Sequence, residues 1–246
     1  MRLQGKTAIV TGGGSGFGAG ILRKFAAEGA KVCVADINFD AAQAVADEVG
    51  GIALSVDVGK AASVDAFAQQ VTEALGGIDI VVNNAGITHL PKPMEEVTED
   101  EFDRVLTVNA KSVYLMARAF VPGMKAAGKG AILNIASTAG LSPRPNLNWY
   151  NASKGWMITA TKTMAVELAP FGIRVNALAP VAGETPLLKS FMGEDTPEMR
   201  AKFVSTIPLG RFSTPEDMGN AACFLCSDEA SMVTGVAMEV DGGRCI

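Results

Sequence analysis

Short apolar runs alternate along the chain with longer segments of mixed apolar and polar residues. The longer segments have helical spacing and end at glycines or prolines, so they predict amphipathic helices. The runs are apolar on both faces, as buried parallel strands are. This alternation predicts an α/β fold with a doubly wound parallel sheet and right-handed crossovers. The predicted strands lie at 6–14, 31–37, 52–58, 78–86, 130–137, 173–180 and 235–243.

Two segments depart from the simple alternation. Residues 98–128 read as one long helical region, which Thr98 opens as a cap with Glu101 three residues later. Pro122 could bend this region. Residues 181–214 show no regular period, and so long an insertion in a compact domain predicts a lid or substrate-binding segment.

Length and charge narrow the function classes. The 246 residues fit one large α/β domain or two small ones, and no linker or repeat divides them. The net charge of −5 and the absence of any Lys or Arg run argue against a nucleic-acid or anionic-membrane partner. No apolar run reaches the roughly 18 residues of a membrane span, and no signal-peptide pattern precedes the first glycines. We therefore expect a cytoplasmic protein.

The cysteine pattern favours a buried core over a metal or redox site. Cys223 and Cys226 form a CxxC, but they lie in a predicted helix with both thiols on one face. The sequence has a single histidine, His89, and one CxxC with one histidine cannot complete a usual zinc site. We predict a reduced chain without a metal.

A glycine-rich loop follows the first predicted strand. In "TGGGSGFG" the glycines allow backbone N–H groups to approach a pyrophosphate, and the start of the next helix favours its negative charge. One register also satisfies GxGxxA, so the motif alone does not choose a subtype. A plain turn is the alternative, but the loop joins a strand to a helix, which favours dinucleotide binding. The candidate contacts are Gly12, Gly14, Ser15, Gly16, Phe17 and Gly18.

Asp36 ends the second predicted strand, 18 residues after Gly18. An acid there can bind an adenosine ribose 2′-OH and would repel a 2′-phosphate. Neither Ser15 nor Ile37 supplies a positive charge, so we predict NAD(H) over NADP(H). The alternative role for Asp36 is to cap the next turn. Further cofactor contacts are expected after strands three and four, at Asp57, Val58, Asn84, Ala85 and Gly86.

The stretch "NWYNASKGWM" places Tyr150 and Lys154 four residues apart, on one face of a predicted helix. Tyrosine has an ordinary pKa near 10, and a nearby lysine charge together with a positive nicotinamide would lower it. The phenol could then exchange a proton with an alcohol or carbonyl. Ser137 could hold the reacting oxygen, and Asn109 could bend its helix and hold a water beside Lys154. Each feature alone is common by chance, so the prediction rests on their combination.

Taken together, the sequence resembles the short-chain dehydrogenases/reductases over essentially its whole length. The matching pieces are "TGGGSGFG", Asp36, "DV" at 57–58, "NNAG" at 83–86, Asn109, Ser137, "YNASK" at 150–154, "NALAP" at 176–180 and "VDGG" at 240–243. The resemblance implies one Rossmann domain over 1–246, with a seven-stranded sheet in the order 3-2-1-4-5-6-7. It also implies a catalytic tetrad of Asn109, Ser137, Tyr150 and Lys154, and a homotetramer built through the long helices and last strand.

The same resemblance adds cofactor contacts after strand six. Lys154 and Tyr150 are expected to contact the cofactor as well as the substrate, with Lys154 on the nicotinamide ribose. Pro180, Gly183 and Thr185 match family positions around the carboxamide. Val181 replaces the usual glycine, which puts the local backbone in question.

The substrate is the least determined feature. His89, Arg144, Trp149 and Phe191 lie in loops expected near the nicotinamide, with Lys92 as a further cation. "GETP", "IPLGRF" and "VDGGRCI" are similar to a subgroup that includes the 4-formylbenzenesulfonate dehydrogenases. This similarity implies oxidation of a benzylic or secondary alcohol, and Arg144 or Lys92 could meet an acid group on it. The alternative is that Arg144 and Lys92 are solvated residues at the rim of the site. Rival functions are an NADPH-dependent 3-oxoacyl-(acyl-carrier-protein) reductase and a non-catalytic dinucleotide-binding sensor.

Overall fold

A computed structural model describes all 246 residues, and its centre is one parallel sheet of seven strands. The sheet order is β3-β2-β1-β4-β5-β6-β7, and every pairing is parallel, so the predicted fold is confirmed. Every strand except β6 is shorter than the apolar run that predicted it. The strands are β1 (Thr7–Thr11), β2 (Lys31–Asp36), β3 (Ile52–Ser55), β4 (Ile80–Asn83), β5 (Gly130–Ile135), β6 (Ile173–Pro180) and β7 (Ala237–Val240).

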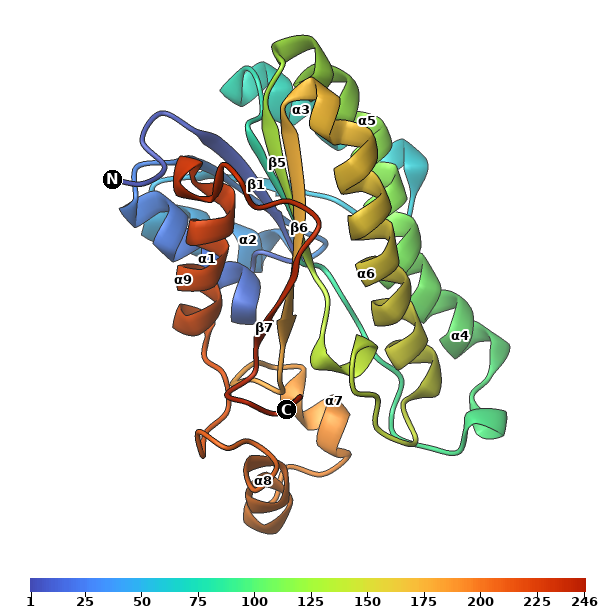
Figure 1. The fold of residues 1–246 in the computed structure, drawn as a ribbon. Coiled ribbons are helices and arrows are strands. Elements are labelled where there is room, and N and C mark those ends of the chain that lie inside the picture. Colours follow the sequence, from blue (N-terminus) through green and yellow to red (C-terminus); the bar gives the residue numbers. More distant parts are fainter.

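Helices cover both faces of the sheet (Figure 1). One layer holds α1 (Gly16–Ala27), α2 (Phe39–Val49) and α9 (Pro215–Cys226). The other holds α3 (Ala61–Leu75), α4 (Glu99–Leu106), α5 (Ser112–Ala127) and α6 (Asn148–Leu168). Such a two-sided cover explains why the strands are apolar on both faces.

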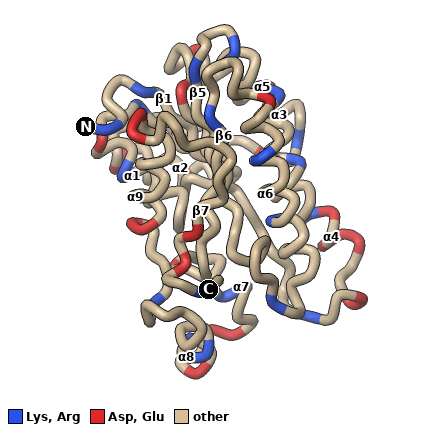
Figure 2. The backbone as a smooth tube through the Cα atoms, in the orientation of Figure 1, with Lys and Arg blue, Asp and Glu red and all other residues tan.

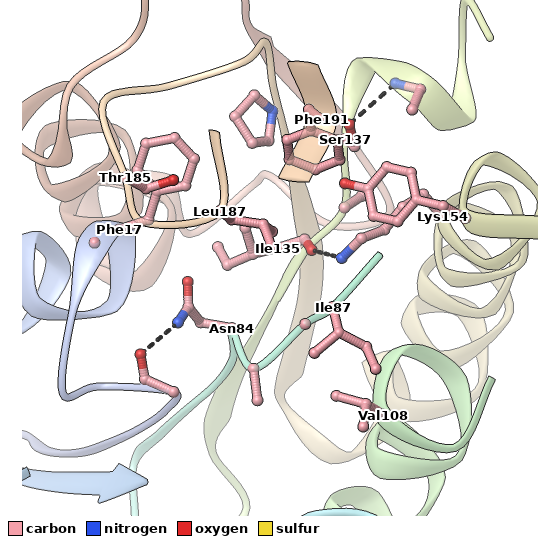
Figure 3. Close-up of a pocket in the computed structure, with 18 of the residues that line it drawn as sticks. Phe17, Asn84, Ile87, Val108, Ile135, Ser137, Lys154, Thr185, Leu187 and Phe191 are labelled. Atoms are coloured by element: carbon pink, nitrogen blue, oxygen red, sulfur yellow. Dashed lines mark hydrogen bonds between the residues drawn. The ribbon is translucent and has the colours of Figure 1, made fainter. Parts of the chain in front are cut away.

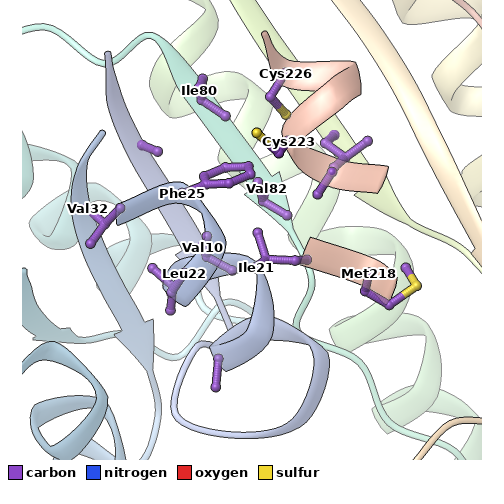
Figure 4. Close-up of a cluster of buried hydrophobic side chains, with 14 of the residues drawn as sticks. Val10, Ile21, Leu22, Phe25, Val32, Ile80, Val82, Met218, Cys223 and Cys226 are labelled. Carbon is purple, nitrogen blue, oxygen red and sulfur yellow. The ribbon is translucent and has the colours of Figure 1, made fainter. Parts of the chain in front are cut away.

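Each face of the sheet has its own hydrophobic core. Along β1, Ala8 and Val10 belong to the core under α1 and α9, while Ile9 belongs to the core under α3 and α5. Cys223 and Cys226 pack beside Phe25 in the first core (Figure 4). Both thiols are buried and free, which confirms their interpretation as core residues.

The long helical region is interrupted once. The Thr98–Glu101 capping box opens α4 as predicted, and α5 continues through Pro122 without ending. Between the two helices, Thr107–Lys111 forms a π-helical turn centred on Asn109. Such turns often mark functional positions because they redirect one side chain.

Residues 181–214 form a separate small unit at the carboxyl end of the sheet (Figure 1). The irregular stretch expected there contains two short helices, α7 (Leu188–Met192) and α8 (Pro197–Val204). They enclose their own hydrophobic cluster of Val181, Leu188, Met192, Ile207 and Phe212. Val181 is thus an anchor of this unit, and it does not adopt the positive φ that would require glycine.

Charged residues of both signs are interspersed over the fold, without a face of basic residues alone in this view (Figure 2). No helix combines the length and apolar character needed to cross a bilayer.

Candidate active site

A cavity of about 880 Å³ opens at the carboxyl ends of the strands. Ligands of open α/β sheets bind at this edge. Most of the predicted site residues line it, namely Gly12, Ser15, Gly16, Phe17, Asp36, Ile37, Asp57, Val58, Asn84, Ala85, Gly86, Ser137, Arg144, Tyr150, Lys154, Pro180, Gly183, Thr185 and Phe191. Figure 3 shows part of this lining, with Asn84, Lys154, Thr185 and Phe191 around one space.

The glycine loop is shaped by close contacts within the protein. Gly12 and Gly16 have φ angles of 63° and 53°, in the left-handed region that favours glycine. A Cβ on Gly18 would lie 2.3 Å from the Gly12 carbonyl oxygen, so Gly18 packs beneath the loop and does not line the cavity. The loop therefore leaves the N-terminal end of α1 uncovered toward the cavity. An uncovered helix N-terminus suits the negative charge of a pyrophosphate.

Asp36 is fixed by two backbone hydrogen bonds. Its Oδ2 accepts from the Gly14 N–H at 3.0 Å, and its Oδ1 accepts from the Asn38 N–H at 3.0 Å. Gly14 contributes through this bond and does not itself line the cavity. The carboxylate is thus held at the cavity wall, where it fits a ribose diol.

Asn84 connects β4 to the glycine loop. Its Nδ2 donates to the carbonyl oxygens of Thr11 at 2.8 Å and Gly12 at 3.0 Å. Nearby, a Cβ on Gly86 would meet the Lys154 Nζ at 3.4 Å. The side chain of Asn84 therefore holds the glycine loop in position. Gly86 has no side chain, so it leaves space in the cavity beside Lys154.

Asp57 lies two residues beyond the end of β3. Its carboxylate pairs with Lys60 at 3.0 Å and accepts from the Gly59 N–H, and Lys60 lowers the pKa of Asp57. The carboxylate of Asp57 therefore already has its partners within the protein. Asp57 and Val58 line the cavity, and we expect them to contact a ligand through their backbone.

Tyr150, Ser137 and Lys154 meet at the other end of the cavity. The tyrosine is buried, and burial raises its pKa to about 12, with the hydrogen bond to Ser137 opposing the rise. Lys154 Nζ donates to the Ile135 carbonyl oxygen at 2.8 Å and lies 5.8 Å from the Tyr150 ring centre. Burial lowers the pKa of Lys154 to about 8.

These values describe the protein without its cofactor. There, burial of the phenol raises the pKa of Tyr150. The predicted lowering of this pKa needs the lysine charge together with a positive nicotinamide, so it stays a prediction for the complex.

Asn109 is completely buried behind the site. Its Oδ1 accepts from the Ile87 N–H at 2.9 Å, and its Nδ2 donates to Ser153 Oγ at 3.0 Å. It does not line the cavity. The structure therefore brings three of the four predicted catalytic residues to the cavity wall and places Asn109 between the β4 loop and α6.

Two of the four predicted substrate contacts lie elsewhere. His89 is buried with its Nδ1 beside the Leu90 carbonyl oxygen, and Trp149 donates to the Met94 carbonyl oxygen and packs edge-on against Phe102. Neither lines the cavity, because both side chains face the 87–97 loop and α4 instead.

Lys92 is also committed elsewhere. It forms an ion pair with Glu101 at 2.8 Å, the same carboxylate that closes the capping box of α4. This leaves Arg144 as the cavity cation among those that the loops suggested.

The remaining predicted substrate contacts do face the cavity. The Phe191 ring stands 5.1 Å from the Tyr150 ring, edge to face. Sequence reasoning missed several further lining residues, among them Asn151, Leu187, Phe203 and Arg244. Asn151 follows Tyr150 directly and could have been found from that position, whereas no local pattern marks Phe203 or Arg244.

One group of potential metal ligands exists, and it lies outside the cavity. It comprises Glu239 in β7 and Asp241 and Cys245 after that strand. Both carboxylate oxygens of Asp241 accept backbone N–H groups, from Gly243 at 2.9 Å and from Cys245 at 2.8 Å. This carboxylate therefore serves the C-terminal turn.

Comparison with known proteins agrees with the geometry. A family model described as enoyl-(acyl carrier protein) reductase, of the short-chain dehydrogenase type, matches residues 12–244. The chain belongs to the short-chain dehydrogenase/reductase family. The membership, expected from the motifs, is thus confirmed, and it makes the protein a member of an oxidoreductase family.

Individual relatives of this family member differ in their activities. The 4-formylbenzenesulfonate dehydrogenase of Comamonas testosteroni is 52% identical over 252 residues, covering 100% of both chains. The 3-oxoacyl-(acyl-carrier-protein) reductase of Thermotoga maritima is 39% identical, again over 100% of both. A crystal structure of 3-ketoacyl-(acyl-carrier-protein) reductase from Brucella melitensis complexed with NADH matches with a TM-score of 0.95 and 50% identity, covering 99% of this chain and 100% of that one.

Proposed function

We propose that this family member is an NAD(H)-dependent oxidoreductase that interconverts an alcohol with a ketone or aldehyde. The carrying observation is one cavity with a fixed carboxylate, Asp36, at one end and a buried Tyr150, Ser137 and Lys154 at the other. The first suits a dinucleotide ribose, and the second suits proton exchange with a hydroxyl.

The cofactor, when bound, would supply the hydride acceptor or donor. The glycine loop would hold its pyrophosphate, and Asp36 with Ile37 its adenosine ribose. Asp57, Val58, Ala85 and Gly86 would border the adenine and central parts. Pro180, Gly183 and Thr185 would meet the carboxamide end, since they line the cavity beside the catalytic group.

Three residues of the chain then handle the proton. Ser137 Oγ would hold the substrate oxygen, and Tyr150 would take the hydroxyl proton during oxidation or return it during reduction. Lys154 would stabilise the tyrosinate once positive charge on the cofactor adds to its own. Asn109, which bonds both the β4 loop and Ser153, is proposed to keep this group in register and to hold a water beside Lys154.

The polar surroundings of Asp36 favour NAD(H) over NADP(H). A 2′-phosphate would stand against a carboxylate that already accepts two backbone N–H groups and cannot turn away easily. The Brucella structure, a ketoacyl reductase complexed with NADH, shows that NADH binding by itself does not separate the two candidate activities.

We place an alcohol dehydrogenase ahead of a 3-oxoacyl-(acyl-carrier-protein) reductase on two grounds. The first is the 52% identity to a 4-formylbenzenesulfonate dehydrogenase. The second is the absence of a basic residue at Ser15 or Ile37, beside Asp36, where an NADPH-dependent reductase would need one. A non-catalytic sensor is disfavoured because it would not need Tyr150, Ser137 and Lys154 together in the cavity.

The wider organisation is also proposed. The chain would act as one domain over 1–246, with 181–214 as a lid over the cofactor and substrate. It would work in the cytoplasm as a homotetramer, on a small-molecule alcohol or carbonyl, without nucleic-acid or membrane partners.

The test is a titration of the purified protein with NADH and with NADPH, followed by nicotinamide fluorescence. We expect NADPH to bind at least tenfold more weakly, which is about 1.4 kcal/mol or more. Turnover is then assayed with benzylic alcohols, sugars and a 3-oxoacyl thioester. Preference for NADPH together with turnover of the thioester would replace this proposal with the reductase. Cofactor binding without turnover of any substrate would favour the sensor.

A further inference from the structure

Two arginines with no acidic partner meet at the substrate end of the cavity. Arg144 lies in the loop between Ser137 and Tyr150, and Arg244 lies in the turn after β7. Both line the cavity, and neither forms an ion pair with an acid anywhere in the chain. Two unpaired guanidinium groups beside one cavity need an explanation, since like charges in a half-buried place repel each other.

Each arginine is held in place by neutral partners. Arg144 donates to Thr206 Oγ1 at 2.7 Å and stacks over the Phe203 ring at 4.6 Å. Arg244 donates to Ser142 Oγ at 3.0 Å and to the Ser142 carbonyl oxygen at 3.3 Å. Each guanidinium has further N–H donors that these bonds leave free.

The backbone around both arginines is tied to the catalytic group. The Ser142 N–H donates to the Thr138 carbonyl oxygen at 2.7 Å, directly after Ser137. Asn151, directly after Tyr150, donates to the Arg144 carbonyl oxygen at 2.7 Å. The two positive charges are therefore fixed relative to the reacting residues.

The charge of the pair is not neutralised locally. Burial lowers the pKa of Arg144, and the positive charge of Arg244 lowers it further, so the two groups act on each other electrostatically. Asp241 is close in sequence, but its carboxylate oxygens accept from the backbone of the C-terminal turn. The acids that line the cavity lie elsewhere: Asp36 ends β2, Asp57 follows β3 and Asp103 lies in α4.

The pair is also separate from the proposed cofactor end. Arg144 and Arg244 follow β5 and β7, whereas Asp36 ends β2 on the opposite side of β1. The cavity's other arginine, Arg104, is exposed on α4 near the Asp57 side, where Gly59 packs against Thr107. The anion that Arg144 and Arg244 would bind is therefore not a 2′-phosphate on the adenosine.

We propose that Arg144 and Arg244 bind an oxyanion of the substrate, so that the enzyme acts on alcohols or carbonyls that carry a carboxylate or sulfonate away from the reacting carbon. Guanidinium groups match both anions through paired N–H donors. The Phe191 and Phe203 rings, which line the same end, would contact an apolar or aromatic spacer between anion and alcohol. This assignment rests on the proposed dehydrogenase function and adds Arg244 as a specificity residue.

The kinetic test compares three alcohols with one ring, namely benzyl alcohol, 4-(hydroxymethyl)benzoate and 4-(hydroxymethyl)benzenesulfonate. We expect wild-type kcat/KM to be at least tenfold higher for one or both anions than for benzyl alcohol. Arg144→Gln and Arg244→Gln should each remove at least tenfold of the anionic rate, mainly through KM, and should lower the benzyl alcohol rate at least fivefold less than the anionic rate. Comparison of kcat/KM for the carboxylate and sulfonate alcohols shows which anion the enzyme prefers.

Two controls separate recognition from folding. Lys202→Gln removes an exposed positive charge from α8 that has no ion pair and does not line the cavity, and it should change neither rate. Arg244→Lys keeps the charge and should recover part of the lost anionic rate. An equal loss with charged and neutral alcohols in the Gln variants, or a wild-type preference for benzyl alcohol, overturns the proposal.

A binding arm keeps the test independent of turnover. Benzoate and benzenesulfonate are titrated against the protein loaded with NADH, with benzamide as the neutral probe. If no alcohol is oxidised, the dehydrogenase proposal fails, and the anion site is then judged on these titrations alone. Anion binding that weakens at least tenfold in Arg244→Gln supports it, and equal binding of anions and benzamide overturns it.

Discussion

At the scale of single residues, burial acts on Tyr150 and Lys154 in the same direction. It raises the pKa of the tyrosine to about 12 and lowers that of the lysine to about 8, so both side chains are driven toward their neutral forms. The protein alone therefore does not prepare a tyrosinate. Under the proposed function, the base forms only in the complex, when the charge of an oxidised nicotinamide joins that of Lys154.

Removal of the phenol hydroxyl tests this role of Tyr150. Tyr150→Phe keeps the ring packed against Phe191 and removes only the proton carrier. We expect kcat to fall by about a hundredfold to ten-thousandfold, the usual range for a lost acid–base group. The dissociation constant for NADH should change less than threefold by fluorescence titration. Wild-type turnover in this variant would refute the mechanism.

Lys154 makes a prediction about stability and pH in the cofactor-free protein. Its folded-state pKa of about 8 is below the ordinary 10.5, so between these values the folded state binds fewer protons than the unfolded state. Stability contributed by Lys154 is therefore lowest below pH 8 and rises as pH increases through this window. Relative to Lys154→Met, wild-type unfolding free energy should rise by about 1 kcal/mol between pH 7 and 9. Urea unfolding at both pH values measures this difference, and a constant difference would show that the lysine is not titrating there.

At the scale of elements, the closest helix contact is between α1 and α9. A Cβ on Gly20 would lie 2.3 Å from the Pro215 carbonyl oxygen, and one on Gly219 would lie 2.7 Å from the Gly20 carbonyl oxygen. These are backbone atoms at the start of α9 and within α1, so they cannot move aside as a flexible side chain could. The glycines let the two helices approach, and α1 is the helix that presents the glycine loop.

Gly20→Ala should therefore destabilise the protein although alanine favours helices. Overpacking of this kind costs about 1–3 kcal/mol, which exceeds the helix-propensity gain of about 1 kcal/mol. Gly123→Ala in α5 is the matched control, because a Cβ there meets nothing within 4 Å. It should leave stability unchanged or raise it by up to about 1 kcal/mol. Equal behaviour of the two variants in thermal unfolding would contradict this account of the α1–α9 contact.

The sequence predicted best what depends on local pattern. The short apolar runs located every strand, and the Thr98–Glu101 spacing located the start of α4. It predicted less well what depends on tertiary contacts. The helices within 181–214 are stabilised by packing on Val181, and His89 and Trp149 turn away from the cavity because the 87–97 loop and α4 offer them partners. Arg244 reaches the site across 102 residues of sequence to Ser142, a separation that no local motif reports.

At the scale of the whole molecule, apolar side chains remain exposed along α5 and α6, which run side by side (Figure 1). They are Tyr114, Trp156 and Val166, with Val166 80% exposed, and Phe171 follows at the end of α6. Exposed large apolar side chains on neighbouring helices are typical of a protein interface. It supports the proposed homotetramer through the long helices.

Light scattering after size exclusion should give the mass of four 25.5 kDa chains. Val166→Glu places a charge in the proposed interface and should reduce that mass to a dimer or monomer. Ala27→Glu is the control, because Ala27 is exposed at the end of α1 and lies outside α5, α6 and β7, and it should leave the mass unchanged. A wild-type protein that elutes as a monomer would overturn the proposed assembly.

The contact between α1 and α9 also bears on how the chain is made. A helix near the start of the sequence, at 16–27, rests its backbone on a helix near the end, at 215–226, so this contact can form only when synthesis is nearly finished. Domains that emerge early on the ribosome usually fold early, but here the part of α1 that packs on α9 must wait for residues 215–226. A message truncated before that point would release a nascent chain with an uncovered sheet face, and such a product is a natural target for chaperones and proteases.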